Sequence, residues 1–450
     1  MSYSIKSRGK TGILFTNWSN TFFCRPELFF VPENVHHLKE IIRLAHLENK
    51  KIRVVGCGHS PSDIACSKDY LISLRQFDRI LHVDPERHQV KVEGGVMVVD
   101  LISYLEKHGL ALRIAGSVSS LTLAGAICTA THGSGVNFGN LSTLVVSMEI
   151  LTSAGEIIEV SRDNDLELFQ AACCSLGALG IIISITYQCE KAYSLELNQY
   201  PCPLHTVLEN LEVHLKSSEH FRFLWFPHTP GTVVSHINRT TKKIVMPSRL
   251  SKWHSWFWEY LVGYYVLELS YYISTLIPSS VPFINRLFYN LLYSKPRKRV
   301  DQSQNIFNFE CLFKQYVNEW SIPIDKTATV LIELENWFSQ NTDVRAHFPI
   351  EVRFVKGDDL LISPSHGRDS CYINIIMYRP YGKLVDYIKY WNAYEDIMTQ
   401  NGGRPHWAKA HKVGPMQLKE MYPMYAKFCQ IRKKLDPTDT FVNSYMERIL

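Results

Sequence analysis

In KIRVVGCGHSPSDIAC, residues 51 to 66, a short strand-like run breaks into a glycine turn that carries a histidine. Residues 52 to 55 have the composition of a buried strand, and GCGHS, residues 56 to 60, then turns sharply. Glycines in such a turn expose successive backbone N–H groups to phosphate oxygens and allow close approach of a ligand. Pro61 stands where a dinucleotide fingerprint would place its third glycine. The turn therefore fits either a phosphate loop or a plain glycine turn with a solvated histidine.

Short strands and helices alternate around this turn, which predicts an α+β fold. No internal repeat or low-complexity linker interrupts the pattern. The clearest expected strands are DYLISL (69 to 74), HQVKVEGG (88 to 95), LGIIISITYQC (179 to 189), FRFLWFPH (221 to 228), FPIEVRFV (348 to 355) and SCYINIIMY (370 to 378). Helices are expected at 35 to 49, 98 to 108, 383 to 401 and 417 to 434.

The composition is that of an ordinary folded protein with room for two or three domains. The 450 residues are 46% hydrophobic and 20% charged, and 48 basic against 43 acidic residues leave a net charge of only +5. This balance does not point to nucleic acid. The eleven cysteines form no C-x-x-C pair, so neither a zinc site nor a disulfide framework is indicated. MSYSIKSRGKTG at the start lacks the apolar segment of a signal peptide, so we expect synthesis in the cytosol.

A long aromatic segment, residues 253 to 299, suggests contact with a membrane. Between residues 260 and 284 the only formal charge is Glu268, and about 20 apolar residues suffice to cross a bilayer. Two prolines interrupt the run, its tryptophans and tyrosines suit a membrane interface, and the basic run at 295 to 299 suits an anionic leaflet. We expect membrane association, by spanning or by lying on the surface. A buried core helix is the alternative.

A second glycine-rich stretch, AGSVSSLTLAGAICTATHGSGVNFGNLS at residues 115 to 142, has few side chains large enough to keep a ligand away. Alone it fits a surface loop as well as a binding loop. Two such stretches in one α+β domain favour a large nucleotide cofactor that lies along the domain.

Seven blocks stand in order along the chain: VVGCGHSPSDIAC, GSVSSLTLAGAICTATHGSG, FRFLWFPHT, PIEVRFVKGDD, SCYINIIMYRPYG, GGRPHWAKAH and LDPTDTFVNSY. Together they resemble the aldonolactone oxidases of the vanillyl-alcohol oxidase flavoprotein family. The resemblance implies a two-domain fold: a PCMH-type FAD-binding domain over residues 12 to 190, and an α+β cap, or substrate, domain over 191 to 415. A helical tail, 416 to 450, would return to the FAD domain.

The resemblance also implies how the cofactor is held. FAD would be bonded covalently, through its 8α-methyl carbon, to His59, and the G-x-G-H-S turn would hold the pyrophosphate. Relatives commonly carry a glycine where this chain has Cys57, which alters the expected backbone geometry. The other residues expected around the cofactor are Gly56, Gly58, Ser60, Ser117, Thr122, Gly125, Thr131, His132, Gly133 and Gly135.

PIEVRFV contributes the first charged pair of the predicted active site. The strand period of two puts Glu351 and Arg353 on one face, while Val352 points away. From the residues alone, a surface ion pair is an open alternative. The family resemblance implies that Glu351 contacts the substrate and that Arg353 stabilises the negative charge of the reduced flavin.

GGRPHWAKAH contributes the second pair. His406 and Lys409 share a face if the segment is helical, and a solvated basic helix start is the alternative. His406 and His411 could be metal ligands, but no further ligand cluster accompanies them, so no metal is expected. The resemblance places both residues beside the substrate, with Lys409 helping to deprotonate the hydroxyl.

The reaction implied by the resemblance is oxidation of an aldonolactone by dioxygen. Gly116 stands where dehydrogenase relatives carry alanine, and the missing methyl group leaves room for oxygen. The expected substrate is L-gulono-1,4-lactone, oxidised at C2 to a 2-keto lactone that tautomerises to L-ascorbate, with hydrogen peroxide as co-product. L-Galactono- or D-arabinono-1,4-lactone are alternatives, as is a membrane flavin protein that no longer turns over. The expected location is the endoplasmic reticulum (microsomal) membrane.

Overall fold

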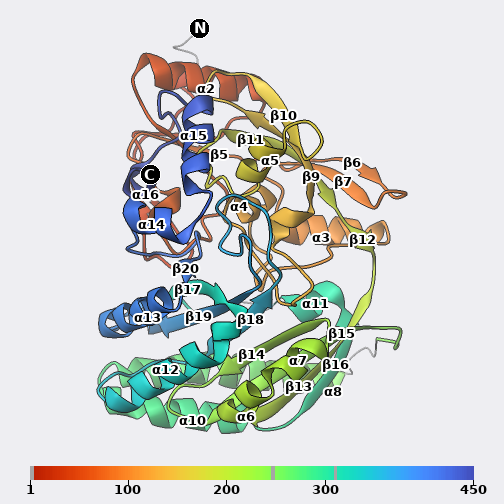
Figure 1. The fold of residues 1–450 in the computed structure, drawn as a ribbon, viewed down its shortest axis with the longest axis vertical. Helices are drawn as coiled ribbons and strands as arrows, with labels where there is room; N and C mark the ends of the chain where they lie inside the picture. Colours follow the sequence, from red (N-terminus) through yellow and green to blue (C-terminus); the bar gives the residue numbers. More distant parts are fainter. Residues whose placement is uncertain (1–4, 245–248, 309–311) are drawn as a thin grey trace.

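The computed structural model describes residues 5–244, 249–308 and 312–450 and has two lobes (Figure 1). The amino-terminal lobe holds the elements from β1 Phe15–Thr16 to β12 Glu190–Lys191 and the last three helices. The cap lobe holds the elements from β13 Ser194–Pro203 to β20 Arg404–Pro405 around one large sheet. The fold is α+β, as the sequence predicted.

A parallel sheet and an antiparallel sheet form the amino-terminal lobe. In the parallel sheet, β5 lies between β3 and β4 and the helix α2 makes the crossover that parallel strands need. The Asn34 side chain caps α2 by accepting from the backbone of His37. The bounds are β3 Leu28–Phe30, α2 Val35–Leu47, β4 Ile52–Val55 and β5 Tyr70–Ser73. In the antiparallel sheet the order is β10 Ile157–Ser161, β9 Val145–Leu151, β11 Ile181–Gln188, β7 Gln89–Glu93 and β6 Ile80–Asp84. The helices that accompany it are α3 Val98–Lys107, α4 Leu123–Cys128 and α5 Leu166–Ala172.

The cap lobe is an antiparallel sheet of eight strands. Alternate residues of its strands face two different apolar clusters, as the strand period requires: Val234 and Ile375 pack in one, Val233 and Ile376 in the other. The strand order is β16 Arg297–Gln302, β13 Ser194–Pro203, β15 Gly231–Thr240, β14 His220–Trp225, β18 Ile350–Val355, β19 Ser370–Tyr378, β17 Gln315–Pro323 and β20 Arg404–Pro405. The first cluster takes in α6 Leu204–Glu209, α12 Thr327–Gln340 and α13 Ile388–Gln400, and the second takes in α9 Leu267–Ser274 and α10 Val281–Leu292.

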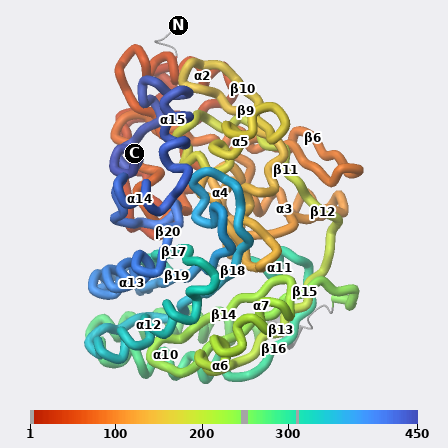
Figure 2. The backbone as a smooth tube through the Cα atoms, viewed as in Figure 1, coloured from red at the N-terminus to blue at the C-terminus, as the bar shows by residue number. Residues whose placement is uncertain are grey.

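The carboxyl-terminal helices return to the amino-terminal lobe (Figures 1 and 2). The Asn443 side chain donates to the carbonyls of Ile64 and Cys66, just after the histidine turn. The backbone N–H of Ile52, on β4, donates to the carbonyl of Thr440 at 2.7 Å. The tail therefore braces both sides of that turn. Its helices are α14 Pro415–Met421, α15 Tyr425–Leu435 and α16 Ser444–Ile449.

Most of the aromatic segment at 253 to 299 folds as a series of short helices, and its last residues begin strand β16. The helices are the end of α8 Arg249–Trp256, a π-helix at Phe257–Val266, then α9 and α10. In the described parts of the chain, no helix is both long and apolar enough to cross a membrane. One side of the segment is buried in the cap lobe, through residues such as Tyr271 and Phe288. Another side exposes large apolar side chains, among them Trp253, Ile277 and Phe283.

Two expectations about local structure are wrong. The helix expected from residue 383 begins at Ile388. The segment with His406 and Lys409 is not helical: Arg404–Pro405 is a strand, and a turn follows in which the N–H of Lys409 donates to the carbonyl of His406. Pairing with β17 explains the difference, because Arg404 and Pro405 lie opposite Ser321 and Trp320 and the N–H of His406 donates to the carbonyl of Glu319 at 2.9 Å. The ten cysteines that the structure describes are free thiols.

Candidate active site

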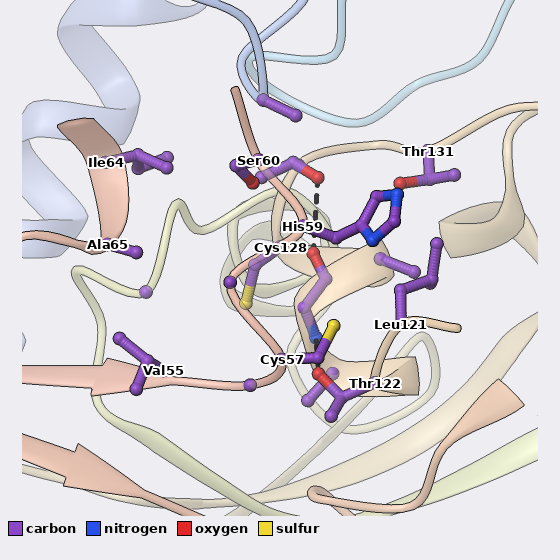
Figure 3. A pocket seen from close by; sticks show the side chains of 18 of the residues that line it. Val55, Cys57, His59, Ser60, Ile64, Ala65, Leu121, Thr122, Cys128 and Thr131 are labelled. Carbon is purple, nitrogen blue, oxygen red and sulfur yellow. Dashed lines mark hydrogen bonds between the residues drawn. The ribbon is translucent and has the colours of Figure 1, made fainter. Parts of the chain in front are cut away.

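A cavity with an empty volume of about 1310 Å³, its open mouth included, lies between the two lobes. One side, here called the loop wall, is formed by residues 55 to 60 and 116 to 132 (Figure 3). The opposite side, the cap wall, is formed by Glu319, Arg353, His406 and Lys409. Of the predicted site residues, those that line this cavity are Gly56, Cys57, Gly58, His59, Ser60, Gly116, Ser117, Thr122, Gly125, Thr131, His132, Arg353, His406 and Lys409.

Two positions of the histidine turn favour glycine. A Cβ on Gly56 would lie 2.2 Å from the hydroxyl oxygen of Thr122, and Gly58 has a φ of +71°. Thr122 is also the N-cap of α4, because its hydroxyl accepts from the N–H of Gly125. Cys57 does not have a positive φ, and its thiol donates to the carbonyl of Ser120 at 3.2 Å. The cysteine is thus accommodated, and it ties the first loop to the second.

The imidazole of His59 belongs to the loop wall (Figure 3). Burial, with a smaller effect of the nearby charge of Lys409, lowers the pKa of His59 to about 4. The ring is therefore neutral at physiological pH. A neutral imidazole has a nitrogen lone pair available to act as a nucleophile.

Three of the predicted site residues lie outside this cavity. Gly133 borders a small neighbouring cavity that shares Ser117 and Arg353 with the main one. The N–H of Gly135 donates to the carbonyl of Phe354 at 2.6 Å, and its φ is +142°. Gly135 therefore docks the second loop against β18. Glu351 is not a lining residue; its carboxylate lies 3.3 Å from the guanidinium of Arg222.

The register of the cap sheet assembles the charged groups. Glu351, Asn374 and Glu319 are direct neighbours across β18, β19 and β17. Arg353 stands two residues after Glu351 on the same face, whereas Val352 is buried in the core. One face of three adjacent strands therefore carries a continuous row of polar side chains.

Glu319 is the centre of the cap wall, and sequence reasoning missed it. Only 1% of it is exposed. Its carboxylate accepts from Arg353 at 2.5 Å and lies 3.5 Å from the Lys409 ammonium and 3.2 Å from the His132 ring. The signal was present, because Glu319 is the only charged residue of the strand QYVNEWSIP. This strand was not predicted, so the sequence alone could not assign Glu319 to a buried position.

The charges at this wall are fixed by their neighbours. Burial alone would raise the pKa of Glu319, but Arg353 and Lys409 outweigh it and hold that pKa well below its usual value. Burial would lower the pKa of Arg353, but the carboxylates of Glu351 and Glu319 raise it. Burial lowers the pKa of His406 well below the usual range, and His132 is shifted in the same direction. The wall thus presents fixed ions beside neutral imidazoles.

His132, Glu319 and His406 offer ligand atoms that all lie within 4.8 Å of one another, a set that could hold a metal ion. The same carboxylate is already paired with Arg353 and faces Lys409. Two fixed cations beside the carboxylate are unfavourable neighbours for a third. The ion pairs account for the cluster without a metal.

The loop wall fits the flavin dinucleotide that the sequence resemblance implies. Arg53 is buried and borders the cavity, and its Nε and Nη1 have no hydrogen-bond partner within the described residues. Such a guanidinium suits the charge of a pyrophosphate. Gly94 and Gly95 also border the cavity, and a Cβ at either would lie 2.2 Å or less from a backbone carbonyl oxygen. These three residues were not predicted as site residues, although the glycine pair after a strand was a visible signal.

Comparisons with known proteins agree with this arrangement. Residues 185–449 match the family model described as D-arabinono-1,4-lactone oxidase, and residues 26–161 match an FAD binding domain. The chain is 49% identical to an L-gulonolactone oxidase of Scyliorhinus torazame and 47% identical to that of Bos taurus, in each case over 98% of this chain and 99% of the relative. A cholesterol oxidase structure from B. sterolicum superposes with a TM-score of 0.80 at 16% identity, covering 97% of this chain and 96% of the other. That likeness concerns the fold, which is the one the sequence resemblance predicted.

Proposed function

The chain belongs to the D-arabinono-1,4-lactone oxidase family of FAD-dependent oxidoreductases, and we propose that it oxidises L-gulono-1,4-lactone at C2 with dioxygen. The products are hydrogen peroxide and a 2-keto lactone that tautomerises to L-ascorbate. The observation that carries the proposal is the cap wall, where Arg353, Glu319 and Lys409 converge on a cavity suited to FAD. The choice of gulonolactone rests on near-50% identity to two L-gulonolactone oxidases over almost the whole chain.

FAD, when bound, accepts a hydride from the substrate carbon and is reoxidised by dioxygen. The protein supplies positions and charges. Arg353, a buried and permanently charged guanidinium, provides the positive charge for the reduced ring. Lys409 stabilises the developing alkoxide and so helps the hydroxyl proton to leave. His406 holds a substrate hydroxyl. Glu351, which lies outside the cavity and 3.6 Å from the Arg353 guanidinium, and Glu319 keep the cations of this wall in place.

Oxygen uptake separates this proposal from its rivals. The purified enzyme is supplied in turn with L-gulono-, L-galactono- and D-arabinono-1,4-lactone, and kcat/KM is compared. We expect the highest value for L-gulono-1,4-lactone, with one peroxide formed per lactone oxidised. A higher value for another lactone would assign that substrate instead. An anaerobic flavin spectrum that no lactone bleaches would mean that the protein does not turn over.

We propose further that His59 carries FAD covalently through the 8α carbon. The neutral imidazole at the cavity and the glycine turn beside it support this. After acid precipitation, yellow flavin should remain with the wild-type pellet and be absent from the His59→Ala pellet. A colourless wild-type pellet from FAD-loaded protein contradicts the bond.

Membrane association at the endoplasmic reticulum is the third proposal. Its support is the exposed apolar side of the helices at 253 to 299, close in sequence to the basic edge strand β16. Flotation with vesicles that contain phosphatidylserine tests it. Wild type should float with them, and the double variant Trp253→Ser, Ile277→Ser should remain in the lower fraction. Equal flotation of both proteins would remove this segment as the contact.

A further inference from the structure

A hairpin near the amino terminus places an aromatic ring against His59. The hairpin pairs β1 Phe15–Thr16 with β2 Phe23–Cys24, and Trp18 lies in the turn between them. The rings of Trp18 and His59 are stacked, with centroids 5.0 Å apart and planes only 8° from parallel. Nothing in the sequence pattern singled out this tryptophan.

The backbone of the same turn holds the residues on both sides of His59. The N–H of Trp18 donates to the carbonyl of Gly58 at 3.0 Å. The side-chain amide of Asn17 donates to the carbonyl of Ser60 at 3.2 Å. Asn17 is buried, and its own carbonyl oxygen accepts from the N–H groups of Thr21 and Phe22. The hairpin turn and the histidine turn therefore form one hydrogen-bonded unit.

The cap lobe also contacts this unit and holds it in place. Arg379, a buried residue that follows β19, donates to the carbonyl of Ser19 at 2.7 Å and to that of Asn20 at 3.0 Å. Trp18 also packs against the apolar cluster of the cap lobe that contains Phe226 and Tyr271. Any movement of the Trp18 indole away from the His59 imidazole would therefore disturb its packing against the cap lobe.

We propose that Trp18 is a positioning residue that sets the plane of the His59 ring for covalent attachment of FAD. The inference deepens the proposed function and rests on the covalent bond proposed above. The ring torsion of a histidine is broad, so an unsupported imidazole would sample many planes. The nitrogen lone pair lies in the ring plane, so the plane decides where it points. Stacking on a fixed indole restricts that plane.

The attachment step balances with dioxygen as the oxidant. A bond forms between an imidazole nitrogen of His59 and the 8α carbon of FAD. One hydrogen leaves the 8α methyl group and one leaves the imidazole nitrogen, and the two electrons released pass through the flavin to dioxygen. The net change is R–CH₃ plus imidazole N–H plus O₂ giving R–CH₂–N plus H₂O₂. The neutral state of His59, whose pKa is about 4, supplies the nucleophile at neutral pH.

The test separates attachment from binding. Full-length apoprotein from riboflavin-deprived cells is mixed with FAD, and total bound flavin and acid-stable flavin are measured over time. The ratio of the two is taken on FAD-loaded protein, so that loss of folded material does not alter it. Trp18→Met fills space without a flat ring, Trp18→Phe keeps a ring, and the exposed Trp253→Met is the matched control.

We expect Trp18→Met to bind FAD but to form acid-stable flavin at least tenfold more slowly than wild type. Trp18→Phe, whose smaller ring can stack on less of the imidazole, should form acid-stable flavin two- to tenfold more slowly than wild type, and Trp253→Met should match wild type. Attachment at the wild-type rate in Trp18→Met overturns the inference. If Trp18→Met yields no loaded protein, Trp18→Phe decides: a rate two- to tenfold below wild type at unchanged FAD binding supports the inference, and a wild-type rate overturns it. Absence of acid-stable flavin in the wild type contradicts instead the covalent bond itself.

Discussion

The two walls of the cavity are built by opposite means. The loop wall comes from two continuous stretches of chain, and its working groups are glycines, backbone N–H groups and small hydroxyls. The cap wall comes from strands β17 and β18 and the turn after β20, which are far apart in the sequence, and its working groups are buried ions. The loop wall depends on glycines, whose missing side chains leave space for a ligand. The cap wall depends on buried charges of opposite sign that neutralise one another. Substitutions should therefore affect binding at one wall and catalysis at the other.

The largest expected effect is at the cap wall. Arg353→Met removes the cation nearest to Glu319 and leaves that carboxylate with Lys409 alone. We expect kcat to fall by about 10²–10³-fold, the loss seen when a fixed electrostatic group is removed from an active site. FAD binding should change much less, because the loop wall is intact. Steady-state oxygen uptake and the flavin absorbance of purified protein measure the two effects.

Arg353→Lys is the control for this variant, since it keeps the charge and loses only the planar geometry. Its kcat should lie between those of wild type and Arg353→Met. A methionine variant that turns over at the wild-type rate would show that the charge is not used.

The second effect is at the loop wall. Gly56→Ala places a methyl group 2.2 Å from the Thr122 hydroxyl, and overpacking of this kind costs about 1–3 kcal/mol. We expect FAD affinity to fall by roughly 10- to 100-fold at this cost, with little change in kcat for the molecules that remain loaded. Titration of apoprotein with FAD, followed by flavin fluorescence, measures the affinity.

Gly414→Ala is the matched control for the loop wall, because a Cβ there meets nothing within 4 Å. The double variant Gly56→Ala, Thr122→Ala removes the clashing hydroxyl and should recover part of the affinity. Equal affinities for Gly56→Ala and Gly414→Ala would mean that the turn relaxes around the methyl group.

The third prediction is that the folded protein loses stability as the pH falls below 6.5. His132 on the loop wall and His406 on the cap wall both have a pKa below the 6.5 of an ordinary histidine, chiefly because they are buried. Below pH 6.5 the unfolded chain takes up protons that the folded chain does not, so the free energy of unfolding falls. Each such histidine contributes a slope of up to about 1.4 kcal/mol per pH unit.

Urea unfolding at pH 7.5, 6.0 and 5.0 measures this slope. His406→Gln should flatten it, whereas His36→Gln, at an exposed position, should leave it unchanged. An unchanged slope in His406→Gln would show that the cap-wall histidine takes up its proton in the folded state as readily as in the unfolded chain.

The smallest expected effect is at Gly116, where the new atom would be tight but tolerable. A Cβ there would lie 3.2 Å from a methyl carbon of Thr131, a contact that small shifts can relieve. We expect Gly116→Ala to keep FAD and to be reduced by lactone normally, but to react with dioxygen more slowly. Stopped-flow reoxidation of the reduced enzyme measures this. Thr131→Ser in the same background relieves the packing contact, so a slow reaction that persists there assigns the effect to the space taken from oxygen.

The two walls also explain what the sequence could and could not predict. The histidine turn is a local feature: its glycines, Thr122 and His59 all lie in two short stretches that can be read directly. Glu351 and Arg353 could be placed on one face because side chains alternate within a single strand, whichever strands it pairs with. Glu319 was missed because its role appears only when β17 is set in register with β19.

Trp18 and Gly135 are two further residues whose roles depend on tertiary contacts that the sequence does not show. Trp18 is one aromatic residue among many until the fold brings its hairpin to His59. The family resemblance placed Gly135 around the cofactor, yet its backbone docks the second loop against β18. A motif identifies the chain segment, but the contact made by each glycine depends on tertiary packing.

The return of the carboxyl-terminal helices has a consequence for synthesis on the ribosome. Residues 436 to 443 hydrogen-bond to β4 and to the chain just after the histidine turn, and they are translated after the entire cap lobe. Until the tail has been translated, the histidine turn of a nascent chain lacks the hydrogen bonds that the tail makes on either side of it. Until Arg379 has been translated, the turn that carries Trp18 also lacks the hydrogen bonds from that side chain. We therefore expect attachment of the flavin, if His59 carries it, to follow docking of the carboxyl-terminal helices and to come late in folding.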